Sequence, residues 1–190
     1  MIISISGLPG SGKSTVAKIV CEKMGYERYY MGGILRKMAE NKGVTILELM
    51  KQAETDSTID EEIDQYVTDL GRNSDNFVIE SRTAFYFIPD ALKVYISVDL
   101  GEASKRIFKD LAKEERKNEE KADSIEELAK KLQERVETDK MRYEKYYGVD
   151  FTNENNYDLV IDSTNLSPEE TAEKIIKMAN DMIKDLENKN

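Results

Sequence analysis

The sequence predicts an α/β fold in which helices cover both faces of a parallel five-stranded sheet. Five short segments rich in β-branched and aromatic residues alternate along the chain with segments of helical periodicity. A glycine-rich turn follows the first strand segment and precedes the first helical one, which is the order found at the start of many such folds. The 190 residues suffice for one domain with its own core.

The first strand and the first helix are predicted on either side of that turn. Ile2, Ile3 and Ile5 form a β-branched run of the kind found in buried strands. Gly25 marks the expected end of the following helix, because glycine readily adopts the left-handed conformation that ends helices. One face of this helix is apolar, at Ala17, Val20, Cys21 and Met24. Cys21 is therefore expected to be a core residue.

The other strands are expected at 27–31, 77–80, 93–98 and 157–161. Helical patterns separate these strands, and the chain ends in one long helix that begins after Ser167. Capping-box pairs mark three of the helix starts: Thr45 with Glu48, Ser124 with Glu127, and Ser167 with Glu170.

Two stretches read as insertions into a minimal sheet domain. The first, about 33–73, is wholly helical in pattern. The second, about 109–147, is dense in Lys, Glu and Arg, and its part "AKEERKNEEKADS" is too polar to bury much surface. This second stretch reads either as a solvated helical hairpin or as a lid that closes on phosphates, and the two readings are compatible. The single domain then has its core at 1–32, 74–108 and 148–190.

The composition excludes several classes of function. The net charge of −10 argues against a large nucleic-acid surface, and no apolar run approaches the roughly 20 residues of a membrane span. The absence of histidine removes a histidine base and any histidine-bound zinc. A single cysteine excludes an internal disulfide and fits a reducing compartment. We expect a cytoplasmic monomer with no signal peptide and with no nucleic-acid or membrane partner.

The glycine-rich turn "GLPGSGKST" matches the phosphate-binding pattern G-x-x-x-x-G-K-[ST]. Its backbone N–H groups and the following helix N-terminus are expected to hold phosphate oxygens. Lys13 is expected to reach the β- and γ-phosphates of ATP, and the Ser14 hydroxyl to ligate Mg²⁺. The candidate ATP-binding residues are Gly7, Leu8, Pro9, Gly10, Ser11, Gly12, Lys13, Ser14 and Thr15.

Two arginines and a carboxylate follow predicted strands. Arg36 comes soon after the second strand, and Arg82 comes just after the third, at the end of the sheet where ligands bind in open α/β folds. An arginine fork binds phosphate oxygens with two donors, which suits both residues to a phosphate. Glu80 ends the third strand and is a candidate to hold Mg²⁺ or its waters.

The remaining arginines divide into three groups. Arg135 and Arg142 are seven residues apart and share a helix face, so both are candidates to reach a phosphate from the lid. For Arg135, a surface pair with Asp139 is the alternative. The orientation of Arg106 stays open. The other three are read as surface residues: Arg28, Arg72 and Arg116.

Five motifs together resemble the nucleoside monophosphate kinases, and most closely the short, archaeal-type cytidylate kinases. The resemblance covers about residues 1–180, and "RYEKYYGVD" followed by "YDLVIDST" is its most specific part. The five motifs are "GLPGSGKST", "MGGILRKMAE", "AETDSTIDEEID", "VIESRTAFYFIPDALKVYI" and "RYEKYYGVDFTNENNYDLVIDST".

The resemblance implies a three-layer αβα P-loop NTPase fold with a helical NMP-binding insertion and a helical lid. It implies transfer of the γ-phosphoryl group of ATP to CMP or dCMP, with Mg²⁺ as cofactor. Arg36 and Arg82 would bind the acceptor phosphate, Gly32 would be a further acceptor-binding residue, and Asp60 and Asp64 would lie over the acceptor base. The catalytic residues would be Lys13, Arg82, Arg135 and Arg142.

Three departures from the family pattern leave the acceptor open. Gly33 stands where the family often carries an acidic or larger residue, and "ESR" replaces the commoner "EGR" or "DGR". Phe85 and Tyr86 are expected to add aromatic bulk near the acceptor pocket. Another nucleoside monophosphate or a small metabolite is therefore an alternative acceptor. A regulator that binds ATP without turnover is a further alternative, which the intact set of charged site residues disfavours.

Overall fold

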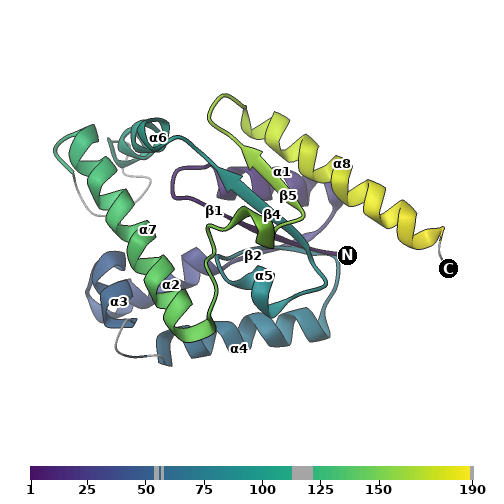
Figure 1. The fold of residues 1–190 in the computed structure, drawn as a ribbon, viewed down its shortest axis with the longest axis horizontal. Helices are drawn as coiled ribbons and strands as arrows, with labels where there is room; N and C mark the ends of the chain where they lie inside the picture. The colour runs from purple at the N-terminus through teal and green to yellow at the C-terminus, as the bar shows by residue number, and fades with distance from the viewer. Residues whose placement is uncertain (54–55, 57, 113–121, 189–190) are drawn as a thin grey trace.

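A computed structural model describes residues 1–53, 56, 58–112 and 122–188 of the chain. In this structure a five-stranded sheet, with strand order β2-β3-β1-β4-β5, forms the middle layer (Figure 1). Every paired strand is parallel to its neighbour, as the sequence predicts. The strands are β1 (Ile2–Gly7), β2 (Glu27–Tyr30), β3 (Phe77–Glu80), β4 (Leu92–Ser97) and β5 (Leu159–Asp162).

Helices cover both faces of the sheet, so the fold has three layers (Figure 1). Helices α1 and α8 pack on one face, and α4 and α5 pack on the other. The helices are α1 (Lys13–Met24), α2 (Met31–Lys42), α3 (Ile46–Ala53), α4 (Thr58–Asn73), α5 (Ala84–Phe87), α6 (Leu100–Ala112), α7 (Ile125–Tyr147) and α8 (Pro168–Glu187), with a 3-10 turn η1 (Glu154–Asn156) before β5.

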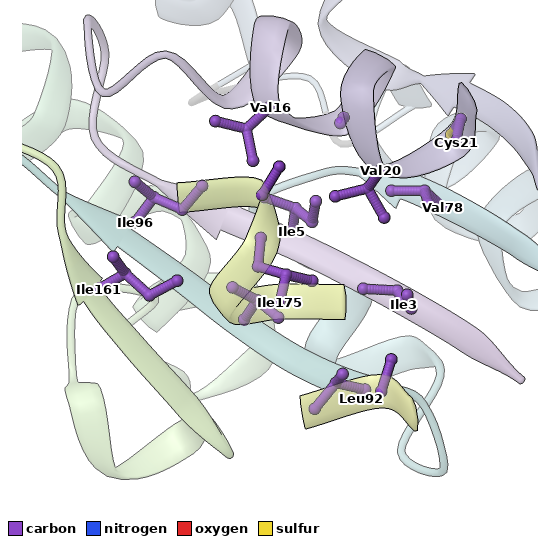
Figure 2. Close-up of a cluster of buried hydrophobic side chains, with 14 residues drawn as sticks. Ile3, Ile5, Val16, Val20, Cys21, Val78, Leu92, Ile96, Ile161 and Ile175 are labelled. Atoms are coloured by element: carbon purple, nitrogen blue, oxygen red, sulfur yellow. The ribbon is translucent and has the colours of Figure 1, made fainter. Parts of the chain in front are cut away.

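The core between the sheet and helices α1 and α8 consists of β-branched and small side chains. Ile3 and Ile5 of β1 are fully buried there, beside Val20 of α1 and Ile175 of α8 (Figure 2). Cys21 lies in the same cluster, and burial raises the pKa of its thiol to about 11. The thiol is therefore neutral near pH 7, as expected for a core residue.

The predicted strands are confirmed, and their ends shift by one or two residues. Met31, predicted at the end of the second strand, begins α2 instead and is buried in the core beneath it. Tyr157 precedes β5, which begins at Leu159. Such shifts at element ends are common, because periodicity identifies an element better than its last residue.

Two of the three predicted capping boxes are complete. The Thr45 and Ser167 side chains accept from the backbone of Glu48 and Glu170, and both carboxylates accept from the cap backbone in return. At Ser124 only half of the box forms. Its side chain accepts from the Glu127 N–H, while the Glu127 carboxylate accepts from the N–H of residue 123.

The two inserted stretches are helical where the structure describes them. Most of α2 and all of α3 and α4 lie in the first, while the C-terminal end of α6 and all of α7 lie in the second. Residues 113–121, which include Arg116 and most of the polar run, lie outside the described residues. Leu128 and Leu132 pack the start of α7 against Ile107 of α6. Among the described residues, no helix has the combined length and apolarity needed to cross a bilayer.

Candidate active site

The glycine-rich turn forms a phosphate loop between β1 and α1. Gly10 and Gly12 have φ angles of 77° and 82°, which lie in the left-handed region that side chains disfavour. A Cβ at Gly10 would also lie 2.9 Å from the backbone of Ala103 in α6. Glycine is therefore required at position 10 for both conformation and space. The loop leaves the N-terminus of α1 directed at the site, where it favours an anion.

Lys13 and Ser14 project from the first turn of α1 into this loop. The Lys13 ammonium donates to the carbonyls of Gly7 and Leu8 at 2.9 and 2.6 Å. The Ser14 hydroxyl donates to Glu80 Oε2 at 2.8 Å, which links the start of α1 to the end of β3. The Ser14 hydroxyl, the Glu80 carboxylate and the Lys13 ammonium therefore lie around the phosphate loop.

Glu80 is buried, and Arg28 is its partner. Arg28 Nε and Nη2 lie 2.6 and 2.5 Å from Glu80 Oε1. Arg28 is exposed, as expected of a surface residue, but its guanidinium also fixes one oxygen of the carboxylate while Ser14 contacts the other. In β2, Arg28 is opposite Val78 of β3, two positions before Glu80.

A cavity of about 410 Å³ opens beside the phosphate loop at the carboxyl ends of β1 and β3. Its volume lies in the range of small-molecule sites. Residues predicted for the donor, the acceptor and the cation all line it, namely Pro9, Gly10, Ser11, Gly12, Lys13, Ser14, Thr15, Gly32, Arg36, Asp60, Asp64, Glu80, Arg82 and Arg135. Gly7, Leu8 and Arg142 do not line it.

The cavity also extends to residues for which the sequence predicted no role. Arg106 lines it, and its Nη2 donates to the carbonyls of Ser163 and Thr164 at 2.9 and 3.1 Å. The Arg106 side chain is therefore directed toward the loop that follows β5, which it holds by these hydrogen bonds beside the phosphate loop. Leu166 adds an apolar wall in the same region.

Arg82 and Arg142 both bind Asp139 of α7. Arg82 Nη1 pairs with Asp139 Oδ2, and Arg142 Nη2 lies 3.0 Å from Oδ1. Asp139 and the Arg142 side chain are fully buried, whereas Arg82 keeps part of its surface in the cavity. Arg142 also contacts Asp60 at 3.1 Å, so its guanidinium lies behind the cavity wall. Its predicted contact with a phosphate requires α7 to move.

Asp60 and Asp64 of α4 face the cavity from one turn of helix. Asp64 accepts hydrogen bonds from the hydroxyls of Tyr147 and Thr83. Burial is the main reason that the pKa of Asp64 rises to about 6, and the nearby charge of Asp60 raises it further. Burial also raises the pKa of Asp60, while Arg142 lowers it.

Replacement of Asp64 by asparagine should change how stability depends on pH. The carboxyl ionises near 3.8 in the unfolded chain and near 6 in the folded protein. The folded state therefore binds more protons between these values, and stability falls as pH rises from about 4 to about 6. We expect the Asp64→Asn variant to gain about 2 kcal/mol relative to the original chain between pH 4 and pH 7. Urea unfolding at both pH values tests this, and parallel curves would contradict it.

Phe85 and Tyr86 do not line the cavity, contrary to expectation. Phe85 is buried on the sheet and packs against Tyr157, with ring centroids 5.0 Å apart. Tyr86 is 45% exposed and packs on Phe87. The aromatic side chains that do line the cavity are Tyr30 and Tyr143, which the sequence interpretation did not select.

Comparison with known proteins gives a consistent result. The cytidylate kinase-like family matches residues 2–165. A cytidylate kinase of Archaeoglobus fulgidus is 38% identical over 178 residues, which cover 93% of each chain. A cytidylate kinase of Sulfurisphaera tokodaii is 36% identical over 185 residues, covering 96% of this chain and 97% of that one. The structure of shikimate kinase from Acinetobacter baumannii in complex with shikimate superposes with a TM-score of 0.63 at 16% identity, covering 95% and 93% of the two chains, and shows the fold alone.

Proposed function

The chain belongs to the cytidylate kinase-like family of phosphotransferases, and from this premise we propose that it transfers the γ-phosphoryl group of ATP to CMP or dCMP. One feature of the structure supports this proposal independently of the family match. A single cavity is lined both by the phosphate loop and by two arginines, Arg36 and Arg82. A phosphoryl donor and an anionic acceptor both fit such a cavity.

In the proposed reaction, an oxygen of the acceptor monophosphate attacks the γ-phosphorus of ATP. The bond between that phosphorus and the β–γ bridging oxygen breaks, and ADP leaves with the bonding electrons. The acceptor oxygen is already anionic at neutral pH, so the reaction needs no strong base. Positioning and charge stabilisation dominate such a transfer, which suits a chain without histidine.

Lys13 and the phosphate loop bind the donor in this proposal. The Lys13 ammonium lies against the loop carbonyls of Gly7 and Leu8 and can exchange them for phosphate oxygens. The part of the cavity beside Arg106 and Leu166 receives the rest of the donor nucleotide. Arg36 and Arg82 bind the acceptor phosphate, Asp60 and Asp64 face its base, and Arg135 approaches from α7.

Ser14 and Glu80 are the residues that would hold Mg²⁺. Their side-chain oxygens are 2.8 Å apart at the mouth of the phosphate loop, and hard oxygen donors suit this cation. Magnesium sites in kinases take few protein ligands and complete their shell with phosphate and water. When bound, the ion neutralises charge on the β- and γ-phosphates. Arg28 keeps Glu80 in place from the other side.

Release of ADP, followed in a coupled assay with Mg·ATP against CMP, dCMP, UMP, AMP and GMP, tests the proposal. We expect fast turnover with CMP or dCMP and weak turnover with the other three. Loss of one bidentate phosphate contact in the Arg82→Ala variant should lower kcat/KM for the acceptor by about 10²-fold or more. Arg72→Ala, on an exposed stretch of α4 outside the cavity, is the matched control.

The outcomes distinguish three cases. Preference for another monophosphate leaves the kinase reaction in place and makes the assigned base wrong. Binding of ATP without turnover of any acceptor contradicts the proposed function. Turnover that survives unchanged in the Arg82→Ala variant contradicts the role given to that arginine.

A further inference from the structure

We propose that Tyr30 is a positioning residue, which holds the Arg36 guanidinium in the orientation that receives an anionic acceptor. The inference deepens the proposed function and rests on it only for the statement that Arg36 binds the acceptor phosphate. No motif selected Tyr30 from the sequence. It is the last residue of β2 and the N-cap of α2, and it lines the cavity.

The contacts between Tyr30 and Arg36 constrain the guanidinium in two ways. Arg36 Nη1 donates a hydrogen bond to the Tyr30 hydroxyl. The guanidinium carbon also lies 5.6 Å from the centroid of the Tyr30 ring, within the range of a cation–π contact. The same nitrogen lies 3.4 Å from the Gly32 carbonyl. The phenol thus contacts Arg36 through both its ring and its hydroxyl.

Tyr30 is itself held by a second guanidinium. Arg28 lies over the Tyr30 ring, with its guanidinium carbon 5.3 Å from the centroid. Arg28 is anchored by the buried Glu80, at 2.5 Å from its Oε1. A continuous set of contacts therefore runs from the cation-binding carboxylate, through Arg28 and Tyr30, to Arg36. Because Glu80 is buried and anchors Arg28, the Arg28 guanidinium restricts the position of the Tyr30 ring.

Two glycines make room for the ring. A Cβ at Gly32 would lie 2.9 Å from Tyr30 Cε2, and a Cβ at Gly33 would lie 2.8 Å from Cδ1. Any side chain at either position would displace the ring from the two guanidinium groups. Gly33, where the sequence departs from the family pattern, is thus explained by the size of Tyr30: the aromatic ring takes the space that a side chain at position 33 would fill.

The physical effect of this arrangement is preorganisation. A free arginine side chain samples many rotamers, and it loses part of this rotamer entropy when it binds a phosphate. Because the Tyr30 phenol already restricts the Arg36 guanidinium in the free protein, less rotamer entropy is lost on binding. The acceptor therefore binds more tightly. The donor nucleotide, held by the phosphate loop, gains nothing from this restriction.

Steady-state kinetics with a pair of tyrosine variants test the inference. Tyr30→Phe keeps the ring and removes the hydroxyl, and we expect the KM for CMP to rise roughly three- to tenfold with the KM for ATP unchanged. Tyr29→Phe is the matched control, because the Tyr29 hydroxyl bonds the exposed Glu27 and lies outside the cavity. In an Arg36→Ala background, Tyr30→Phe should add no further effect on the acceptor.

An equal rise in both KM values, or a persistent effect without Arg36, overturns the positioning role in favour of a general structural one. A second readout does not depend on turnover. In ¹⁵N NMR of the arginine side chains, with the Arg36 resonances assigned by their loss in Arg36→Lys, guanidinium rotation should be slow in the original chain. It should become fast in Tyr30→Phe and stay slow in Tyr29→Phe.

Unchanged Arg36 rotation in Tyr30→Phe overturns the inference, whatever the enzyme assays give. Faster rotation in that variant, in a protein that turns over no monophosphate, supports the positioning of Arg36 while the proposed function fails. The two results are therefore separable.

Discussion

Replacing Lys13 with alanine should lower kcat for phosphoryl transfer by about 10³-fold or more, with the fold intact. The Lys13 ammonium is the cationic nitrogen that touches the phosphate loop, at 2.9 and 2.6 Å from the Gly7 and Leu8 carbonyls. In the proposed reaction it neutralises charge that grows on the donor as the β–γ bond breaks. Its removal therefore raises the energy of the transition state more than that of the bound ground state.

The measurement is kcat at saturating Mg·ATP and CMP, with the far-ultraviolet circular dichroism melting curve as a check on folding. Lys18→Ala is the matched control, because Lys18 is an exposed lysine of the same helix whose partner is Glu22 at 3.9 Å. Lys18→Ala should keep its full rate. A Lys13→Ala variant that retained more than about a tenth of the rate would remove this lysine from the catalytic set.

Replacing Asp139 with alanine should lower the free energy of unfolding by about 3–5 kcal/mol, because it leaves buried positive charge with fewer partners. Asp139 is fully buried and pairs with both Arg82 and Arg142. Arg142 is buried as well and would keep only Asp60 as a carboxylate partner at 3.1 Å. The loss is large because the fully buried Arg142 guanidinium has no ready access to water.

Urea unfolding at pH 7 measures this effect. Glu137→Ala, two residues earlier on the exposed side of α7, removes the same kind of charge and should cost less than about 1 kcal/mol. Asp139→Asn keeps the shape of the side chain, and a large loss in this variant too would identify the charge as the cause. Equal urea midpoints for the Asp139→Ala and Glu137→Ala variants would show that the ion pairs of Asp139 contribute nothing special to the free energy of unfolding.

Much of the fold follows from local patterns in the sequence. The strands are predictable because short β-branched runs that alternate with helices are typical of strands buried in a parallel sheet. The carboxyl ends of parallel strands meet at one edge, so residues just after β1 and β3, such as Lys13 and Arg82, are predictable as neighbours. What shifted were the ends of elements, as at Met31, where helix and strand patterns overlap.

The missed and misplaced residues depend on packing that no local pattern encodes. Asp139 stands in a helix rich in acidic residues, and only the approach of two arginines from other elements distinguishes it. Arg28 lies on an edge strand, and only the register of β2 on β3 brings it to Glu80. Phe85 was placed in the acceptor pocket, but the short helix α5 turns it onto the sheet.

The buried Arg142 guanidinium joins three helices: it lies 3.3 Å from the Met50 carbonyl of α3, 3.1 Å from Asp60 of α4 and 3.0 Å from Asp139 of α7. Tyr146 of α7 adds a hydrogen bond to the Ala53 carbonyl of α3 at 3.0 Å. These contacts join the stretches 33–73 and 109–147, which are separate in the chain, into one packed unit. A chimera that exchanges residues 33–73 with those of a relative must exchange α7 as well, because the Arg142–Asp60 ion pair takes one partner from each stretch.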